Sequence, residues 1–137
     1  MTYVVVDASI WVARLVPQDE FHDLCKAWLE EKRSNAVVLV APSLLLVELA
    51  GAVSRRTGSS ELAERALQSL KHMPGLRLVE MNQTVVDDAA SLAAILGMRG
   101  ADALYAAVAH HLNIPLATLD NDQRDRASKV IQIEMLS

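Results

Sequence analysis

Short apolar runs alternate along this chain with longer stretches in which apolar residues recur every third or fourth position. The runs are rich in valine, isoleucine and leucine, and they predict strands at residues 3–6, 37–41, 76–81, 116–119 and 130–133. The stretches between them predict helices at residues 8–15, 20–33, 42–56, 59–74, 82–97, 101–113 and 121–128. Nearly continuous apolar strands that alternate with helices are typical of a parallel sheet covered by helices on both faces.

Residues that commonly begin or end helices stand at the expected boundaries. Ser59 and Asn82 can accept hydrogen bonds from the first turn of a helix, and Pro42 suits a first turn. Gly58 and Gly97 follow two of the helices, where a glycine often ends the helix. Because no repeat, linker or low-complexity segment interrupts this order, we expect residues 1–137 to form a single domain.

Composition adds limits on the partners and the compartment. The chain has 137 residues, of which 52% are hydrophobic, and a core of that size needs no stabilising disulfide. The apolar runs are too short to span a bilayer and no signal peptide is present, so we expect no membrane partner. Cys25 is the only cysteine, which agrees with a cytoplasmic location. The net charge of -4 gives no overall attraction for nucleic acid, so such binding would need a local basic patch or bound metal.

Two carboxylates stand directly after apolar strands. Asp7 follows the strand at 3–6, and Asp120 follows the strand at 116–119. Ligands of parallel sheets bind beyond the carboxyl ends of the strands, at the point where strand order reverses. Either residue could instead serve only as a turn residue or a helix cap.

Two further acidic residues lie in apolar helices. Glu48 in "SLLLVELAGAV" has little polar surface around it, so its charge needs a cation, a hydrogen-bond donor or a proton. An ion pair with Arg55 or Arg56 is the structural alternative, although both lie about two helical turns away. Asp102 begins the helix "ADALYAAVAHHLN", where capping is the alternative to a functional role.

Convergence of these four carboxylates would require a cation. Six pairs at about 6 Å would repel by roughly 3 kcal/mol each at an effective dielectric constant of ~20. The sum, more than about 15 kcal/mol, exceeds the whole stability of a typical domain. An all-oxygen ligand set favours Mg²⁺ or Mn²⁺. Zinc is disfavoured because the chain has neither an HExxH motif nor a Cys/His pair at zinc spacing.

Several segments, in their order and spacing, resemble the PIN-domain nucleases, and most closely the VapC-like toxins of toxin-antitoxin pairs. The matching segments are "VVVDASIW", "PSLLLVELAGAVSR", "RGADALYAAVAHHLNIPLATLD" and "VIQIE", which together extend over nearly the whole chain. The resemblance implies that residues 1–137 form a PIN-like α/β/α sandwich around a five-stranded parallel sheet of order 3-2-1-4-5. In that order the reversal falls between the strands that precede Asp7 and Asp120.

The resemblance also implies roles for individual residues. The family's catalytic and metal-binding acids correspond to Asp7, Glu48, Asp102 and Asp120. Its small hydroxyl positions, which support the site, correspond to Ser9 and Thr118, and Asp122 is a possible additional acid. Contacts with RNA phosphates could come from any of six arginines, of which Arg14 and Arg99 lie nearest in sequence to these positions; the others are Arg55, Arg56, Arg124 and Arg126. The alternatives are a helix cap for Ser9, a strand residue for Thr118 and solvated surface charges for Asp122 and the arginines.

The implied function is metal-dependent endoribonuclease activity, in which a metal-activated water hydrolyses an RNA phosphodiester bond in the cytoplasm. The implied partners are an RNA substrate, a cognate antitoxin and a second copy of the chain. Two amphipathic helices, at 21–29 and 62–73, could supply a dimer surface. Their large side chains could equally belong to the core: Trp28, Leu29, Leu67, Leu70 and Met73. A haloacid-dehalogenase-type phosphatase is disfavoured because Ser9 stands where that chemistry needs a second aspartate. A catalytically silent PIN-like interaction module is disfavoured because it would gain nothing from four repelling carboxylates.

Overall fold

The protein is described here by a computed structural model that includes all 137 residues. Seven helices and four strands follow one another in nearly the predicted order. They are β1 (Tyr3–Val6), α1 (Ala8–Leu15), α2 (His22–Ser34), β2 (Val38–Pro42), α3 (Leu44–Thr57), α4 (Ser60–Lys71), β3 (Leu76–Val79), α5 (Gln83–Leu96), α6 (Gly100–Leu112), β4 (Leu116–Ala117) and α7 (Asn121–Ala127). Ser59 and Asn82 cap α4 and α5 as expected, and Gly58 and Gly97 end α3 and α5 with φ values of 70° and 68°.

The strands form one parallel sheet in the order β3-β2-β1-β4. The predicted parallel α/β architecture is confirmed, but the sheet has four strands rather than five. The fifth predicted strand, at 130–133, is reduced to a single parallel bridge between Ile133 and Leu116 of β4. Because β4 itself has only two residues, it offers the last segment too short an edge to form a full strand. That segment nevertheless lies where order 3-2-1-4-5 would place strand 5.

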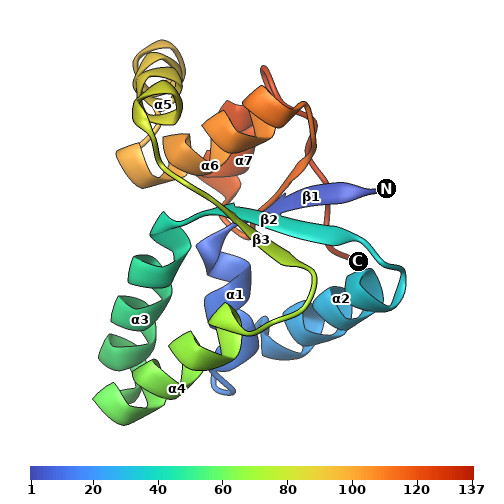
Figure 1. The fold of residues 1–137 in the computed structure, drawn as a ribbon, viewed down its shortest axis with the longest axis vertical. Helices are drawn as coiled ribbons and strands as arrows, with labels where there is room; N and C mark the ends of the chain where they lie inside the picture. The colour runs from blue at the N-terminus through green and yellow to red at the C-terminus, as the bar shows by residue number, and fades with distance from the viewer.

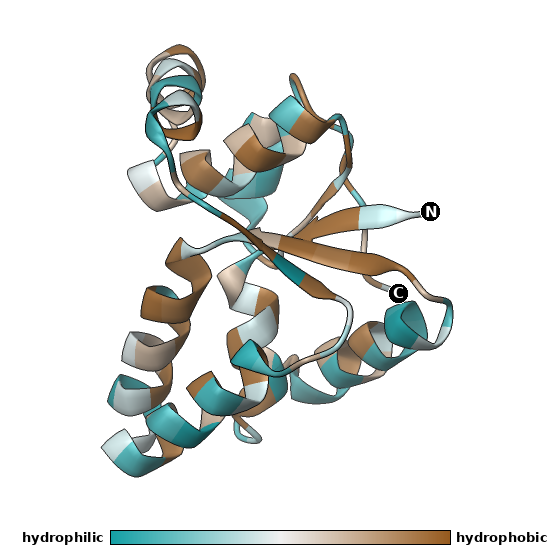
Figure 2. Cartoon of the chain, viewed as in Figure 1, coloured by the Kyte–Doolittle hydropathy of each residue, from teal (hydrophilic) through white to brown (hydrophobic).

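Helices cover both faces of the sheet and make three layers. Figure 1 shows α1, α2, α3 and α4 on one side of the strands and α5, α6 and α7 on the other. The strands are hydrophobic along almost their whole length, whereas most helices have one hydrophobic and one polar side (Figure 2). This distribution follows the expected pattern, since a sheet covered on both faces has no solvent-exposed side.

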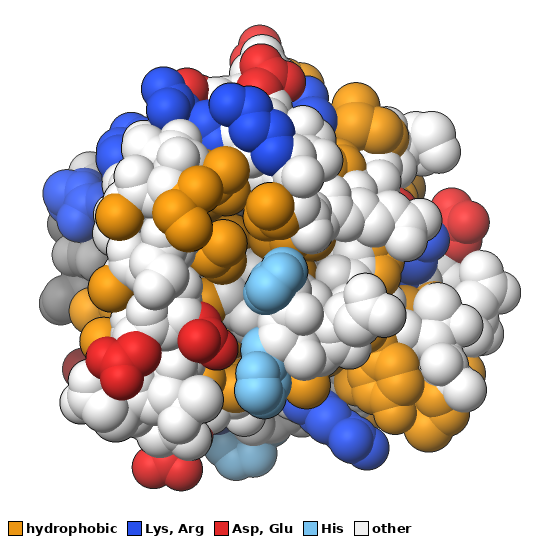
Figure 3. Space-filling view, turned by 90° about the horizontal axis from the view of Figure 1, so that it is seen from above, with side chains coloured by type: hydrophobic (Ala, Val, Ile, Leu, Met, Phe, Trp, Pro, Cys, Tyr) orange, Lys and Arg blue, Asp and Glu red, His pale blue; other side chains and the backbone are white.

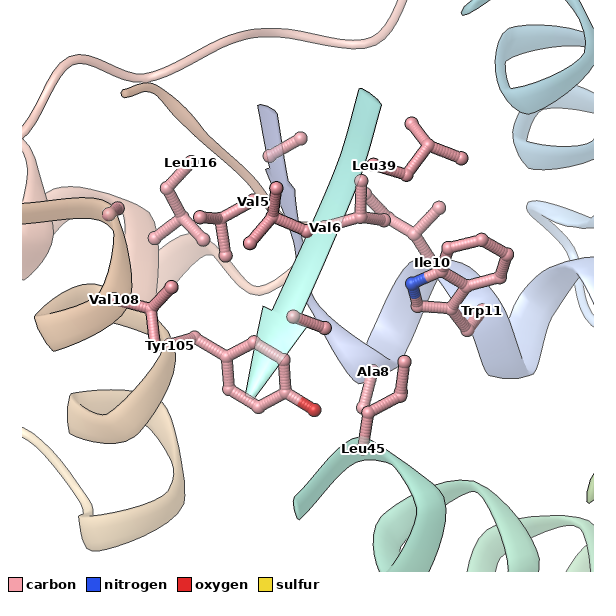
Figure 4. Packing of buried hydrophobic residues seen from close by; sticks show 14 of the residues in the cluster. Val5, Val6, Ala8, Ile10, Trp11, Leu39, Leu45, Tyr105, Val108 and Leu116 are labelled. Atoms are coloured by element: carbon pink, nitrogen blue, oxygen red, sulfur yellow. The ribbon is translucent and has the colours of Figure 1, made fainter. Parts of the chain in front are cut away.

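The core is continuous from the sheet into the helices next to its carboxyl edge. Val5 and Val6 of β1, Trp11 of α1, and Tyr105 of α6 are all fully buried. Figure 4 shows the Tyr105 ring passing the end of the strands, with its hydroxyl pointing toward Ala8 and Leu45. The core therefore fixes the relative positions of α1, α3 and α6 at this edge.

The side chains that were candidates for a dimer surface belong mainly to the core. Trp28, Leu29 and Leu70 are buried, and Leu67 and Met73 are partly buried. Hydrophobic side chains are exposed elsewhere, among them Val47 of α3 and Ile95 of α5. In the view that looks down on the α5 and α6 side of the molecule, hydrophobic side chains lie between charged groups and histidines (Figure 3).

No single helix has the length and apolar character needed to cross a membrane. Helices α5 and α6 reach that length and apolar character only when they are taken together, and the chain bends by 112° between them.

Candidate active site

Asp7 is a buried carboxylate that both caps a helix and faces the carboxyl edge of the sheet. The valine run of β1 ends at Asp7, whose extended backbone conformation lets the side chain turn back over the first turn of α1. Its Oδ2 accepts a hydrogen bond from the Ser9 amide at 3.0 Å. Capping a helix and facing the edge of the sheet were alternative roles for Asp7 in the sequence. In the structure the residue does both.

A buried polar network supports Asp7 from the other end of the chain. The Thr118 hydroxyl donates to Gln123 Oε1 at 2.8 Å, and Gln123 Nε2 donates to Asp7 Oδ1 at 3.2 Å. The Ser9 hydroxyl accepts from the Leu119 amide at 3.1 Å. Thr118 and Gln123 are almost completely buried. These contacts orient the Asp7 carboxylate and join α1, β4 and α7 at the predicted point of strand reversal.

Glu48 lies on α3 and is held by a tyrosine from the opposite layer. The Tyr105 hydroxyl donates to Glu48 Oε1 at 2.8 Å. Burial raises the pKa of the Glu48 carboxyl, the Tyr105 hydrogen bond opposes this, and the charges of Asp7 and Asp102 raise the pKa further. Burial of the Tyr105 ring and the nearby Glu48 charge raise the pKa of Tyr105 far above its usual value. The phenol therefore keeps its proton and donates it in the hydrogen bond to Glu48. Glu48 forms none of the ion pairs observed in the structure, and it is thus not the partner of Arg55 or Arg56.

Asp102 and Asp120 share one arginine. Arg99 precedes α6 and places its Nε 3.3 Å from Asp102 Oδ2 and its Nη2 2.8 Å from Asp120 Oδ2. The other oxygen of Asp120 accepts from the Gln123 amide at 3.0 Å and so caps α7. The Asp102 carboxyl has a raised pKa, caused first by burial and then by the charge of Asp7, with Arg99 acting in the opposite direction.

The four acidic residues are electrostatically coupled at one edge of the sheet. Asp7 raises the pKa of both Glu48 and Asp102, Asp102 also raises that of Glu48, and Asp120 raises that of Asp102. Interactions of this kind require the groups to lie near one another. The structure therefore brings together residues that are separated by up to 113 positions in the sequence.

The donor set suits a hard divalent cation, although its side chains are not arranged as a finished metal site. No three histidine, cysteine, aspartate or glutamate side chains have the spacing needed to hold an ion. Each carboxylate instead accepts hydrogen bonds from the protein: Asp7 from Ser9 and Gln123, Glu48 from Tyr105, and the remaining two from Arg99. Because Asp102 and Asp120 both reach the same guanidinium, both can reach a common cation. Carboxylate oxygens are also the ligands that Mg²⁺ and Mn²⁺ prefer.

Not every residue proposed from the sequence faces this cluster. Ser9, Thr118 and Arg99 lie in it, as described above. Asp122 is exposed and pairs with Arg126 at 2.9 Å. Arg14 lies beside α2, where burial and the nearby Arg33 lower its pKa.

Two residues of the cluster, Gln123 and Tyr105, were not found by sequence reasoning. Gln123 sits in the polar segment "DNDQRDRA", which gives no sign that one amide is buried. Tyr105 occurs in an apolar helix, where an aromatic residue indicates core packing. Its position three residues after Asp102, on the same helix face, was the only available signal.

The sequence profile of the PIN domain family matches residues 4–129. Solved structures are similar over almost the whole chain. VapC20 from Mycobacterium tuberculosis, described as a sarcin-ricin loop cleaving toxin, has a TM-score of 0.79 and 20% identity, covering 96% of this chain and 98% of VapC20. A chain of VapBC2 from Rickettsia felis, solved with a DNA fragment from its promoter, has a TM-score of 0.76 and 19% identity, with 99% and 100% coverage. A chain of FitAcB from Neisseria gonorrhoeae has a TM-score of 0.69 and 20% identity, with 98% and 96% coverage.

No curated protein matches the sequence. The fold and the acidic edge of the sheet define the class of PIN-domain proteins. Because the profile match extends over most of its length, the chain belongs to the PIN domain family. Within that class its fold is VapC-like.

Proposed function

We propose that the protein is a metal-dependent endoribonuclease that acts as the toxin of a toxin-antitoxin pair. The observation that carries this proposal is the electrostatic coupling of four acidic residues at the carboxyl edge of the sheet, next to the reversal between β1 and β4. The similarity to a toxin described as cleaving the sarcin-ricin loop supports RNA as the substrate class. The similarity to VapBC2 and FitAcB supports an antitoxin as a partner.

In this proposal Asp7, Glu48, Asp102 and Asp120 hold one or two Mg²⁺ or Mn²⁺ ions. A divalent ion in such a site supplies an activated water and neutralises charge on the scissile phosphodiester. The chain's own contribution is to hold its carboxylates in place. Gln123 fixes the orientation of Asp7, and Tyr105 fixes that of Glu48.

The same similarity leads us to propose a homodimer in the cytoplasm. The exposed Ile95 gives α5 an apolar surface that a second copy could cover. A silent PIN-like module stays disfavoured, because relieving the coupled charges would stabilise a protein with no use for them. A haloacid-dehalogenase-type phosphatase also stays disfavoured, because the Ser9 hydroxyl binds a backbone amide in place of a second acid.

Replacement of the two strand-end aspartates tests the proposal. Asp7→Asn and Asp120→Asn should each lower Mn²⁺-dependent cleavage of a fluorescent single-stranded RNA by at least about 100-fold, because each removes a charged metal ligand. The fold should survive, since asparagine caps helices about as well as aspartate. Asp23→Asn, at an exposed position on α2, is the matched control and should cleave like the unmodified protein. Full activity in either site variant would remove that residue from the mechanism.

A further inference from the structure

A groove leads away from the carboxylate cluster between α1 and α3. It has a volume of 550 Å³ and begins beside Ser9 and Glu48. Elsewhere it is lined by Arg55 and Arg56, near the end of α3, and by Asp19, which pairs with Arg56. The groove therefore connects the acidic site with two cationic side chains.

One face of α3 forms a wall of this groove. Glu48, Ala52, Arg55 and Arg56 recur at the spacing that aligns residues along a helix. From Glu48 to Arg56 the helix advances about 12 Å, at ~1.5 Å per residue. The arginines thus lie two turns from the site, too far to neutralise the carboxylates and far enough to hold a different part of a bound chain.

A second groove adjoins the first at Arg56. It has a volume of 780 Å³, lies between the segment after α1 and helices α3 and α4, and shares Arg56 with the first groove. Arg65 of α4 lines it as well. Three arginines therefore follow one another along a path that starts at the carboxylate cluster.

Two of these arginines have no acidic partner. Arg55 and Arg65 are exposed and take part in none of the ion pairs of the structure, whereas Arg56 pairs with Asp19 at 2.7 Å. By contrast, Arg99 and Arg126 are occupied by carboxylates. Free guanidinium groups bind phosphate oxygens in a bidentate manner. The path thus provides the local basic patch that a chain with a net charge of -4 needs in order to bind nucleic acid.

We propose that a single-stranded RNA substrate lies in these two grooves, with its backbone phosphates on Arg55 and Arg65 and its scissile phosphate at the carboxylate cluster. This inference rests on the proposed function, and it names the surface that binds the substrate. An RNA fits better than an acidic peptide, because the path ends at Ser9 and Glu48. There the carboxylates repel a peptide's acidic side chains, whereas a metal ion attracts a phosphate.

RNA binding without cleavage tests this path. The probe is a short fluorescein-labelled single-stranded RNA, and its affinity is measured by fluorescence anisotropy over a range of salt concentrations in the Asp7→Asn background. Adding Arg55→Gln and Arg65→Gln together should weaken binding by about tenfold or more. The slope of log affinity against log salt should fall by about 1.4, since each lost phosphate contact on a single strand contributes ~0.7.

The matched control removes two arginines from a different surface. Arg33 and Arg77 line a separate pocket of 440 Å³ together with Met1 and Pro74. The Arg33→Gln/Arg77→Gln pair changes the net charge equally, so it should leave the salt slope nearly unchanged. In the cleaving protein, the groove pair should raise KM for RNA more than it lowers kcat.

The possible outcomes distinguish a failure of the proposed RNA path from a failure of the proposed nuclease function. Equal affinities and equal slopes for the groove and control pairs would overturn the path, even if the protein cleaves RNA. A groove pair that keeps RNA affinity but loses affinity for a poly-glutamate peptide would also overturn it, in favour of a protein partner. A groove-dependent loss of RNA binding would support the path, even if the protein with Asp7 intact failed to cleave RNA and the proposed catalysis were rejected.

Discussion

At the scale of single residues, the site is a set of neighbouring carboxylates, each of which accepts hydrogen bonds from other groups of the protein. Arg99 partly neutralises two of these carboxylates at once, because its guanidinium contacts both Asp102 and Asp120. A divalent ion that binds the same two carboxylates must compete with this guanidinium or displace it. Arg99 is largely exposed, so it can leave without disturbing the core.

Arg99→Gln should therefore tighten Mn²⁺ binding severalfold, as measured by calorimetry. It should also lower the melting temperature without added metal, since Asp102 and Asp120 lose their shared cation. Arg99→Lys keeps the charge and should fall between the two proteins. An unchanged Mn²⁺ affinity in Arg99→Gln would mean that the arginine and the ion do not compete.

Glu48 contributes to a second property, the dependence of stability on pH. Its pKa is raised above the usual 4.5 in the folded chain, mainly by burial, so the folded chain takes up this proton at a higher pH than the unfolded chain. The contribution of Glu48 to the free energy of unfolding must therefore fall as pH rises from about 4.5 through the raised pKa. The ionised form is the destabilising one at neutral pH.

Glu48→Gln should raise the melting temperature at pH 7 without metal, because it removes the ionised form that burial and the neighbouring carboxylates destabilise. The glutamine oxygen can still accept from Tyr105, so the hydrogen bond is retained. Added Mn²⁺ should stabilise this variant less than the unmodified protein, because a ligand that binds only the folded state stabilises it more the more tightly it binds. Glu64→Gln, on the exposed side of α4, is the control. Equal melting curves for Glu48→Gln and the unmodified protein would contradict the proposed repulsion.

At the scale of secondary-structure elements, most of the fold could be predicted from local signals. The strand at 3–6 and the helix at 8–15 have the expected bounds, because an apolar run and a capping aspartate are both local features. The fifth strand was predicted wrongly because its pairing depends on the length of β4, which the sequence at 130–133 does not encode. The buried amide of Gln123 was missed for a related reason, since its partner Asp7 directly follows β1, far away in the sequence.

Gln123 shows how one side chain attaches an element to the site. It is the residue of the short helix α7 that reaches both Thr118 and Asp7. Gln123→Met keeps the approximate volume but leaves a buried oxygen of Asp7 without its donor. The free energy of unfolding should fall by about 1–2 kcal/mol, measured by urea denaturation with an unchanged m-value.

The control for this experiment is Gln68→Met on the exposed surface of α4, which should change the stability by less than about 0.5 kcal/mol. RNA cleavage should also decrease in Gln123→Met, since the Asp7 carboxylate loses one of the hydrogen bonds that orient it. A variant as stable and as active as the unmodified protein would show that the buried network does not position Asp7.

At the scale of the whole molecule, the acidic site and the basic path lie on one continuous surface. The net charge of -4 hides this arrangement, because negative charge is concentrated at the site while two free arginines lie along the groove. An antitoxin that blocks the enzyme would need a cation for the site. The contact of Arg99 with two carboxylates is a template for how an arginine from a partner would bind there.

Metal and antitoxin should therefore compete for the same carboxylates. If the antitoxin inserts an arginine among Asp7, Glu48, Asp102 and Asp120, its Kd should rise as Mn²⁺ is increased, measured by calorimetry at constant ionic strength. Titration with NaCl to the same ionic strength controls for general screening, which weakens exposed ion pairs whatever the cation. The Asp120→Asn variant should bind the antitoxin more weakly and with a smaller Mn²⁺ effect, because it lacks one ligand that both the metal and the arginine require. Antitoxin affinity that is independent of Mn²⁺ would place the antitoxin outside the site, where it could inhibit only by covering the groove.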